Sequence, residues 1–65
     1  MRIKVNGQDY ELSDGGDIQA LLAACKLPVD QVAVELNRRL VRAGKYDTKL
    51  KAGDEVEIVT FVGGG

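Results

Sequence analysis

Histidine is absent from this sequence of 65 residues, and cysteine occurs only once, at Cys25. Without an imidazole the chain cannot build a Cys–His pair, a Ser–His triad or a histidine-containing zinc site. A single cysteine also excludes an internal disulfide framework. In so small a chain these absences argue against an enzyme. We therefore expect no catalytic residue, no metal site and no bound cofactor.

Long apolar runs and a strong net charge are also missing. No apolar run approaches the ~20 residues of a membrane span, and residues 1–4 do not have the pattern of a signal peptide. The net charge of −1 gives no general attraction to nucleic acid or to an anionic membrane. We expect a cytoplasmic protein with neither of these partners.

Basic residues gather in one stretch, which contains a single acid, Asp47. Tyr46 is the only aromatic residue among them and no RNA-binding motif accompanies them, so we interpret the stretch as a solvated face. A second interpretation is steering toward an acidic surface on a partner protein. The basic residues are Arg38, Arg39, Arg42, Lys45, Lys49 and Lys51.

The length is right for one small domain, which we place at residues 1–65. A chain of this size can bury about 60% of the surface that it exposes when unfolded. The apolar content of 45% is sufficient for a single compact core and argues against wholesale disorder. No internal repeat and no second domain is evident.

The first half of the sequence predicts a β-hairpin followed by a helix. Polar and apolar residues alternate over 2–5 and 8–12, on either side of Asn6-Gly7, the strongest two-residue hairpin signal. Asp17 is a suitable N-cap for the helix, which we expect to end near Lys26 because of the proline that follows. Its apolar face has the spacing i, i+3, i+4, i+7. The residues on that face are Ile18, Leu21, Leu22 and Cys25.

The second half predicts further strands. Alternation over 32–37 indicates a third strand, and residues 40–41 could form a short edge strand with Tyr46 and Leu50 packed beneath it. The last strand is expected over 56–62. This order indicates an α+β fold with a mixed sheet of four to five strands and one main helix on one face. The first and last strands should pair in parallel at its centre, because a long connection separates them.

Three glycines, Gly63, Gly64 and Gly65, follow the last strand directly. Because glycine has no Cβ, we expect residues 62–65 to form a thin, flexible tail that can enter a narrow channel in a partner. A carboxylate presented in this way can act as a substrate that a nucleotide activates and that is then converted to an ester, an amide or a thioacid. The tail is the best functional clue in the sequence.

The last strand has an apolar side chain on each of its faces. If Val56 and Ile58 face the core, then Val59 and Phe61 form an apolar patch on the outer face of the sheet. An apolar patch beside a reactive tail is typical of a docking surface, to which we also assign Val62. The alternative is that Phe61 only packs locally over the sheet edge.

The sequence resembles the ThiS family of sulfur carriers, which are ubiquitin-like β-grasp proteins of the ThiS/MoaD type. The resemblance covers the whole chain, and the combination of its motifs with a terminal diglycine makes it specific. The motifs that carry it are residues 1–7, 34–37, 50–59 and 61–65. One departure is Arg38-Arg39 after Asn37, where such proteins often have Asn-Gly. It concerns the geometry of the turn and leaves the tail chemistry unaffected.

The resemblance implies a carrier that enzymes act on. The carboxylate of Gly65 would be adenylated by a ThiF-type adenylyltransferase, which uses ATP and Mg. It would then become a thiocarboxylate with sulfur from a cysteine desulfurase. A ThiG-type thiazole synthase would take the sulfur for the thiazole of thiamine. Gly63 and Gly64 would reach into the partner active sites. A sulfur relay through Cys25 is disfavoured, because a free cysteine on an apolar helix face behaves as a small core residue.

Two other functions remain open on the sequence alone. The first is the small subunit of molybdopterin synthase, or another β-grasp sulfur carrier with the same tail chemistry. Such relatives tend to be longer between the helix and the last strand, so the compact length favours the thiamine pathway. The second is a ubiquitin-like modifier or binding module.

Overall fold

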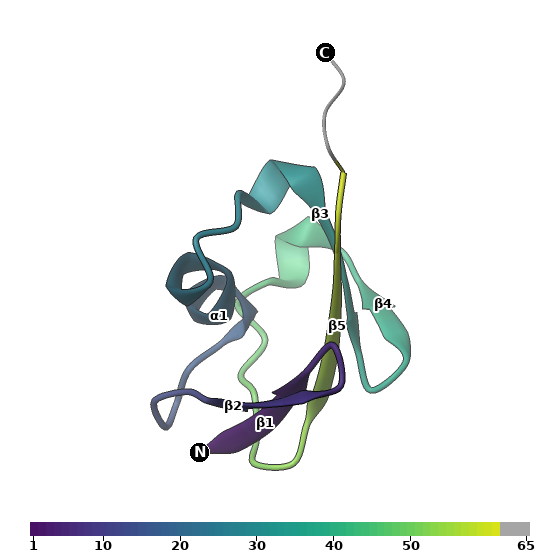
Figure 1. The fold of residues 1–65 in the computed structure, drawn as a ribbon. Helices are drawn as coiled ribbons and strands as arrows, with labels where there is room; N and C mark the ends of the chain where they lie inside the picture. The colour runs from purple at the N-terminus through teal and green to yellow at the C-terminus, as the bar shows by residue number, and fades with distance from the viewer. Residues whose placement is uncertain (62–65) are drawn as a thin grey trace.

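The computed structural model describes residues 1–61, and these form one sheet with a single α-helix (Figure 1). Two single-turn 3₁₀ helices, η1 and η2, lie in the connections. The elements are β1 (Arg2–Val5), β2 (Gln8–Glu11), α1 (Ile18–Ala24), η1 (Val29–Gln31), β3 (Val32–Leu36), β4 (Arg39–Val41), η2 (Ala43–Lys45) and β5 (Glu55–Thr60).

The five strands lie in the order β2-β1-β5-β3-β4. β1 and β5 pair in parallel, whereas β1–β2, β3–β4 and β3–β5 are antiparallel. The expected α+β fold, with the first and last strands joined in parallel at the centre, is therefore confirmed. α1 covers one face of the sheet, and the other face is open (Figure 1). β5 thus joins an N-terminal hairpin to a second hairpin.

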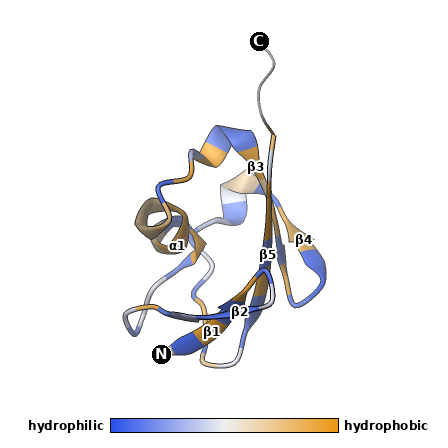
Figure 2. Cartoon of the chain, viewed as in Figure 1, coloured by the Kyte–Doolittle hydropathy of each residue, from blue (hydrophilic) through white to orange (hydrophobic). Residues whose placement is uncertain are grey.

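The core lies between α1 and the sheet. Ile18, Leu21 and Leu22 of the helix are fully buried, as their spacing predicts, and most of α1 is coloured as hydrophobic in Figure 2. Burial of each such side chain is worth roughly 1.5–3 kcal/mol relative to exposure. The other buried apolar residues are Ile3, Leu12, Val32, Val34, Tyr46, Leu50, Val56 and Ile58.

α1 has defined signals at both ends. The Asp17 carboxylate accepts a hydrogen bond from the Ala20 N–H over 2.7 Å, which confirms the predicted N-cap. The helix ends at Ala24, two residues before the expected end near Lys26. Lys26 has φ +58°, and the N–H groups of Lys26 and Leu27 donate to carbonyls of the last turn. This is a Schellman motif in which lysine occupies the place that glycine usually takes.

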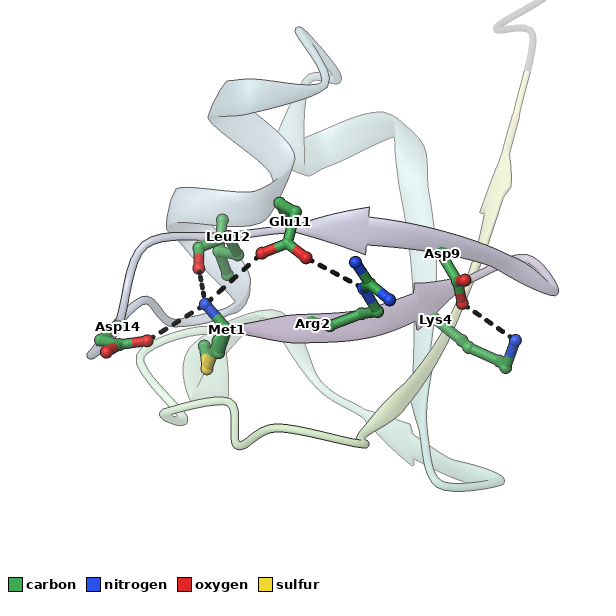
Figure 3. Close-up of polar contacts among 7 residues, drawn as sticks. All are labelled: Met1, Arg2, Lys4, Asp9, Glu11, Leu12 and Asp14. Atoms are coloured by element: carbon green, nitrogen blue, oxygen red, sulfur yellow. Dashed lines mark hydrogen bonds and ion pairs between the residues drawn. The ribbon is translucent and has the colours of Figure 1, made fainter.

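Ion pairs line the β1–β2 edge of the sheet (Figure 3). Lys4 contacts Asp9 over 3.0 Å and Arg2 contacts Glu11 over 3.0 Å, and both pairs are exposed. The hydrogen bond from Lys4 and its charge hold the pKa of Asp9 below the ordinary value of 3.8. Asp9 therefore stabilises the folded chain above that value and ceases to do so as the pH falls through its lowered pKa. Exposed pairs of this kind contribute little to stability.

No helix within residues 1–61 has both the length and the apolar character that crossing a membrane would require.

Candidate functional site

β5 separates a buried face from an exposed one. Val56 and Ile58 are buried in the core, whereas Val59 is 58% exposed and Phe61 is 56% exposed. The expected assignment of the two faces of this strand is therefore confirmed. The strand ends at Thr60 rather than at residue 62, but Phe61 still donates its N–H to the Gln31 carbonyl over 2.8 Å.

The exposed apolar residues belong to a larger patch on the open face of the sheet. In the strand register Ala33 of β3 lies opposite Val59, and Leu40 of β4 lies opposite Glu35. Leu40 is 67% exposed, and the sequence argument overlooked it. The signal was the pair Leu40-Val41, because Val41 packs against the core and its neighbour must then face outward. We call Ala33, Leu40, Val59 and Phe61 the outer apolar patch.

The outer face changes character along β5. Toward the start of the strand, Glu55 and Glu57 alternate with the buried residues, and Glu57 lies opposite Glu35 of β3. Toward the end of the strand, the outward residues are Val59 and Phe61. The outer face is therefore apolar next to residue 62 and acidic farther from it. This distribution is typical of an interface with an apolar centre and a charged rim.

Two asparagine side chains hold β5 where its neighbouring strands end. The Asn6 amide accepts from the Ile58 N–H over 2.8 Å and donates to the Ile58 carbonyl over 3.2 Å. On the other edge, Asn37 accepts from the Glu55 N–H over 2.9 Å and donates to the Asp54 carboxylate over 3.1 Å. Each side chain thus forms hydrogen bonds with β5, or with the residue before it, at the point where the backbone of the neighbouring strand turns away. These contacts were not foreseen from sequence.

Asp54 is the buried polar residue of this region, with an exposed fraction of 7%. Besides the Asn37 amide, its carboxylate accepts the Lys51 N–H over 2.8 Å. The turn that leads into β5 is therefore closed by a carboxylate whose hydrogen bonds are satisfied. This arrangement fixes the start of the strand whose far end leads to the tail.

Cys25 is only partly buried, although the sequence argument placed it in the core. It caps the C-terminus of α1 and packs against the edge of the core cluster beside Tyr10. The neighbouring Cys25 thiol and, after it, desolvation raise the pKa of Tyr10 above its ordinary value of 10.0. The thiol lies on the helix side of the sheet, whereas the outer apolar patch lies on the opposite face.

The remaining expected site residues, Val62, Gly63, Gly64 and Gly65, lie outside the described residues. Their roles therefore stay predictions. Within residues 1–61, no group of three His, Cys, Asp or Glu side chains is arranged to hold a metal ion. None of the ion pairs in that same part of the chain involves the basic residues of 38–51, which agrees with a solvated face.

Comparison with known proteins assigns the family. A profile of the ThiS family matches residues 3–65. The chain belongs to the ThiS family. The expectation drawn from the sequence motifs is therefore confirmed. Among ThiS-family proteins of similar length, the sulfur carrier protein ThiS of Bacillus subtilis is 40% identical over 65 residues, which cover 97% of this chain and 98% of the relative.

Structures and longer relatives agree with the ThiS assignment. A crystal structure of the thiamine biosynthesis protein ThiS from Geobacter metallireducens superposes with a TM-score of 0.84 at 35% identity, covering 100% of both chains. Thiazole synthases of Magnetococcus marinus and Paramagnetospirillum magneticum are each 35% identical over 66 residues. Those matches cover 100% of this chain but only 20% of each synthase, so the chain spans about a fifth of their length.

Proposed function

We propose that this chain is a cytoplasmic sulfur carrier of thiamine biosynthesis, which enzymes act on and which has no catalytic activity of its own. The family match, which extends through residue 65, carries this proposal. The Bacillus subtilis relative supports it, because a protein named as a sulfur carrier matches nearly from end to end. The lack of histidine in the sequence agrees with a carrier that needs no acid or base.

The proposed chemistry takes place at the carboxylate of Gly65. That oxygen attacks the α-phosphorus of ATP, pyrophosphate leaves, and an acyl-adenylate forms. The terminal sulfur of a cysteine persulfide then attacks the acyl carbon and AMP leaves, which gives an acyl disulfide. A second thiol breaks the S–S bond, forming a protein disulfide and releasing the thiocarboxylate. Adenylation is required because an oxide is a very poor leaving group.

The proposed partners are an adenylyltransferase of the ThiF type, a cysteine desulfurase as the source of sulfur, and thiazole synthase as its acceptor. Two relatives named thiazole synthase contain a segment that matches this entire chain, which supports the last partner in particular. The outer apolar patch supplies a docking surface, since Val59 and Phe61 are exposed immediately before the tail.

The test is sulfur loading in a defined mixture. The chain is incubated with ATP, Mg, cysteine, the adenylyltransferase and the desulfurase, and its intact mass is measured. We expect a gain equal to the exchange of one oxygen atom for one sulfur atom, and no gain without ATP. An unchanged mass, with enzymes that load the Bacillus subtilis carrier, would refute the proposal.

Variants of the tail provide the controls. Removal of Gly65 shifts the carboxylate by about 3.5 Å and should abolish adenylation, because misplacement by even 1 Å can matter in an active site. Gly64→Val should slow activation, since a β-branched side chain would obstruct a channel shaped for bare backbone. Neither change removes a contact within residues 1–61, so both variants should melt as the unmodified chain does.

A further inference from the structure

Backbone groups along β5 point alternately to its two neighbours. The odd-numbered residues bond toward β3, as shown by the Phe61 N–H, which donates to the Gln31 carbonyl over 2.8 Å. The even-numbered residues bond toward β1, as shown by the Asn6 N–H, which donates to the Val56 carbonyl over 2.9 Å. This parity follows from the antiparallel register of β3 and β5.

On the β1 side the neighbouring strand stops before β5 does. β1 ends at Val5, the Asn6 side chain bonds to Ile58, and the chain then turns away at Gly7, which has φ +82°. The next even-numbered residue is Thr60, whose N–H and carbonyl point to the side that the hairpin has left. Within residues 1–61 neither group has a hydrogen-bond partner on that side, and Thr60 is exposed.

Within the part of the chain that the structure describes, the sheet therefore has a third open edge, in addition to the outer edges of β2 and β4. This edge begins beyond Ile58, the last residue of β5 that the Asn6 side chain contacts, and it includes the backbone of Thr60. An unpaired strand edge is a template for an added strand, in which backbone hydrogen bonds supply the attraction and neighbouring side chains supply the selectivity. Here the neighbouring side chains are Val59 and Phe61 of the outer apolar patch.

We propose that an extended segment of thiazole synthase adds to this edge of β5 and pairs with the Thr60 backbone. The proposal rests on the proposed function and specifies how that partner holds the carrier. In the proposed function the reacting carboxylate is that of Gly65, four residues after Phe61, so a span of four residues places it within about 14 Å of Phe61 even at full extension. An enzyme that encloses Gly65 must therefore bring its surface against the end of β5.

Pairing at Thr60 would also direct the tail. Any segment that an active site binds loses conformational entropy, and this loss weakens association. A strand pair formed just before the tail aligns the backbone on entry and reduces the freedom that remains to be lost. The requirement lies in the main chain of Thr60, so substitution of its side chain alone should have little effect on binding.

The test removes one backbone donor by N-methylation. The chain is made by total synthesis with ligation between Ala24 and Cys25, once with N-methyl-Thr60 and once with N-methyl-Glu11. Glu11 is the matched control, because it is exposed, on the edge strand β2 and outside the outer apolar patch. It lies opposite Arg2, and since the Leu12 N–H donates to the Met1 carbonyl, the N–H of Glu11 points away from β1. Neither N–H is used within the described fold.

Affinity for the thiazole synthase of the same organism is measured by calorimetric titration, with a melting curve for each chain. We expect N-methyl-Thr60 to bind roughly tenfold more weakly or worse, N-methyl-Glu11 to bind as the parent does, and all three chains to melt alike. In the unmethylated chain, the Thr60 N–H should exchange rapidly with solvent when free and slowly in the complex. This exchange measurement decides the matter if a methylated chain fails to fold.

Several outcomes would overturn the inference. Equal affinity of N-methyl-Thr60 and the parent, or a Thr60 N–H that stays unprotected in the complex, would show that no strand is added there. Protection that grows with the concentration of the chain alone would identify a second copy as the occupant. A parent chain that gains sulfur but binds without using Thr60 refutes only this inference. A parent chain that neither gains sulfur nor binds refutes the proposed function as well.

Discussion

At the scale of single residues, the two hairpin turns show the same backbone built from different sequences. Asn6 and Gly7 have φ +51° and +82°, and Asn37 and Arg38 have φ +50° and +71°. Both are turns of the type that favours Asn-Gly. The departure noted in the sequence therefore leaves the turn geometry intact, but it places an arginine in the left-handed region, which costs roughly 1–2 kcal/mol.

Arg38→Gly should relieve that cost. Allowing for the greater freedom of glycine in the unfolded chain, we expect the free energy of unfolding to rise by about 1 kcal/mol. For a domain of this size that corresponds to a melting temperature higher by about 4–8 °C. The reciprocal variant, Gly7→Arg, should lower the stability by a similar amount. Thermal melts of both variants are the measurement, and an unchanged or lower melting temperature for Arg38→Gly would contradict the interpretation.

Cys25 provides a second prediction at this scale. Cys25 is the C-cap residue of α1 through its backbone N–H, and its thiol lies on the helix side of the sheet. Cys25→Ala should therefore still gain sulfur at the C-terminal carboxylate in the loading mixture. Its stability should fall by roughly 1 kcal/mol, since a partly buried sulfur is lost. Intact mass and a urea melt test the two parts. A folded variant that no longer accepts sulfur would restore the relay role that we rejected.

Sequence reasoning at the residue scale succeeded where a local signal existed. The N-cap Asp17 and the buried positions of α1 follow from patterns within one helix. For Asn6 the sequence predicted only a turn. Its hydrogen bonds with Ile58 could not be predicted, because they join positions 52 residues apart in the chain. The end of α1 was also predicted imprecisely. Lys26 adopts a left-handed conformation that ends the helix early, and the presence of a proline two residues later does not predict that conformation.

At the scale of elements, β5 depends on side chains as well as on strands. Its pairing with β1 covers only Glu55 and Val56 in the strand register. The Asn6 amide extends that edge by two hydrogen bonds to Ile58. The central strand is therefore held on the β1 side largely by the residues of one turn.

Asn6→Gly tests this role, because glycine keeps the positive φ and removes only the amide. Two hydrogen bonds at about 0.5–1.5 kcal/mol each predict a loss of roughly 1–3 kcal/mol in the free energy of unfolding. Hydrogen exchange at the Ile58 N–H should also accelerate more than exchange elsewhere in β5. Gln8→Ala, which changes an exposed neighbour without a side-chain hydrogen bond within residues 1–61, is the control. Equal stability of the two variants would exclude the proposed support.

Elements were predictable to the extent that their patterns were periodic. The alternation in 2–5 and 32–36 identified the strands, and the helix followed from its apolar spacing. β4 was foreseen only as residues 40–41, because three residues are too few to show a period, and it begins at Arg39. The 3₁₀ turns η1 and η2 carry no such period and were not foreseen.

At the scale of the whole molecule, the two faces of the sheet differ in their exposure to solvent. One is buried beneath α1, and the other carries the outer apolar patch. The sequence correctly predicted the outward Val59 and Phe61 but not the contribution of Leu40, because that requires knowing how β4 pairs with β3. Whether the patch binds a partner remains a prediction.

Phe61→Ala is the direct test of the patch. The ring is more than half exposed, so its removal should change the melting temperature little, while the loss of an interface aromatic commonly costs about 2 kcal/mol or more in binding. We expect affinity for the adenylyltransferase to fall roughly tenfold or more, and further with Val59→Ala. Val29→Ala is the control, because Val29 is also exposed but lies in η1, outside the patch. Lost stability with unchanged affinity would make Phe61 a core residue instead.

The central place of β5 has a consequence for how the protein is made. β5 is the last of the described elements to emerge during synthesis, yet it joins the hairpin of β1 and β2 to that of β3 and β4. A nascent chain that stops before residue 55 contains two hairpins and a short helix with no strand between them. Such a chain cannot close the core and exposes apolar surface that invites degradation. Completion of the fold and presentation of the outer apolar patch therefore depend on the same strand.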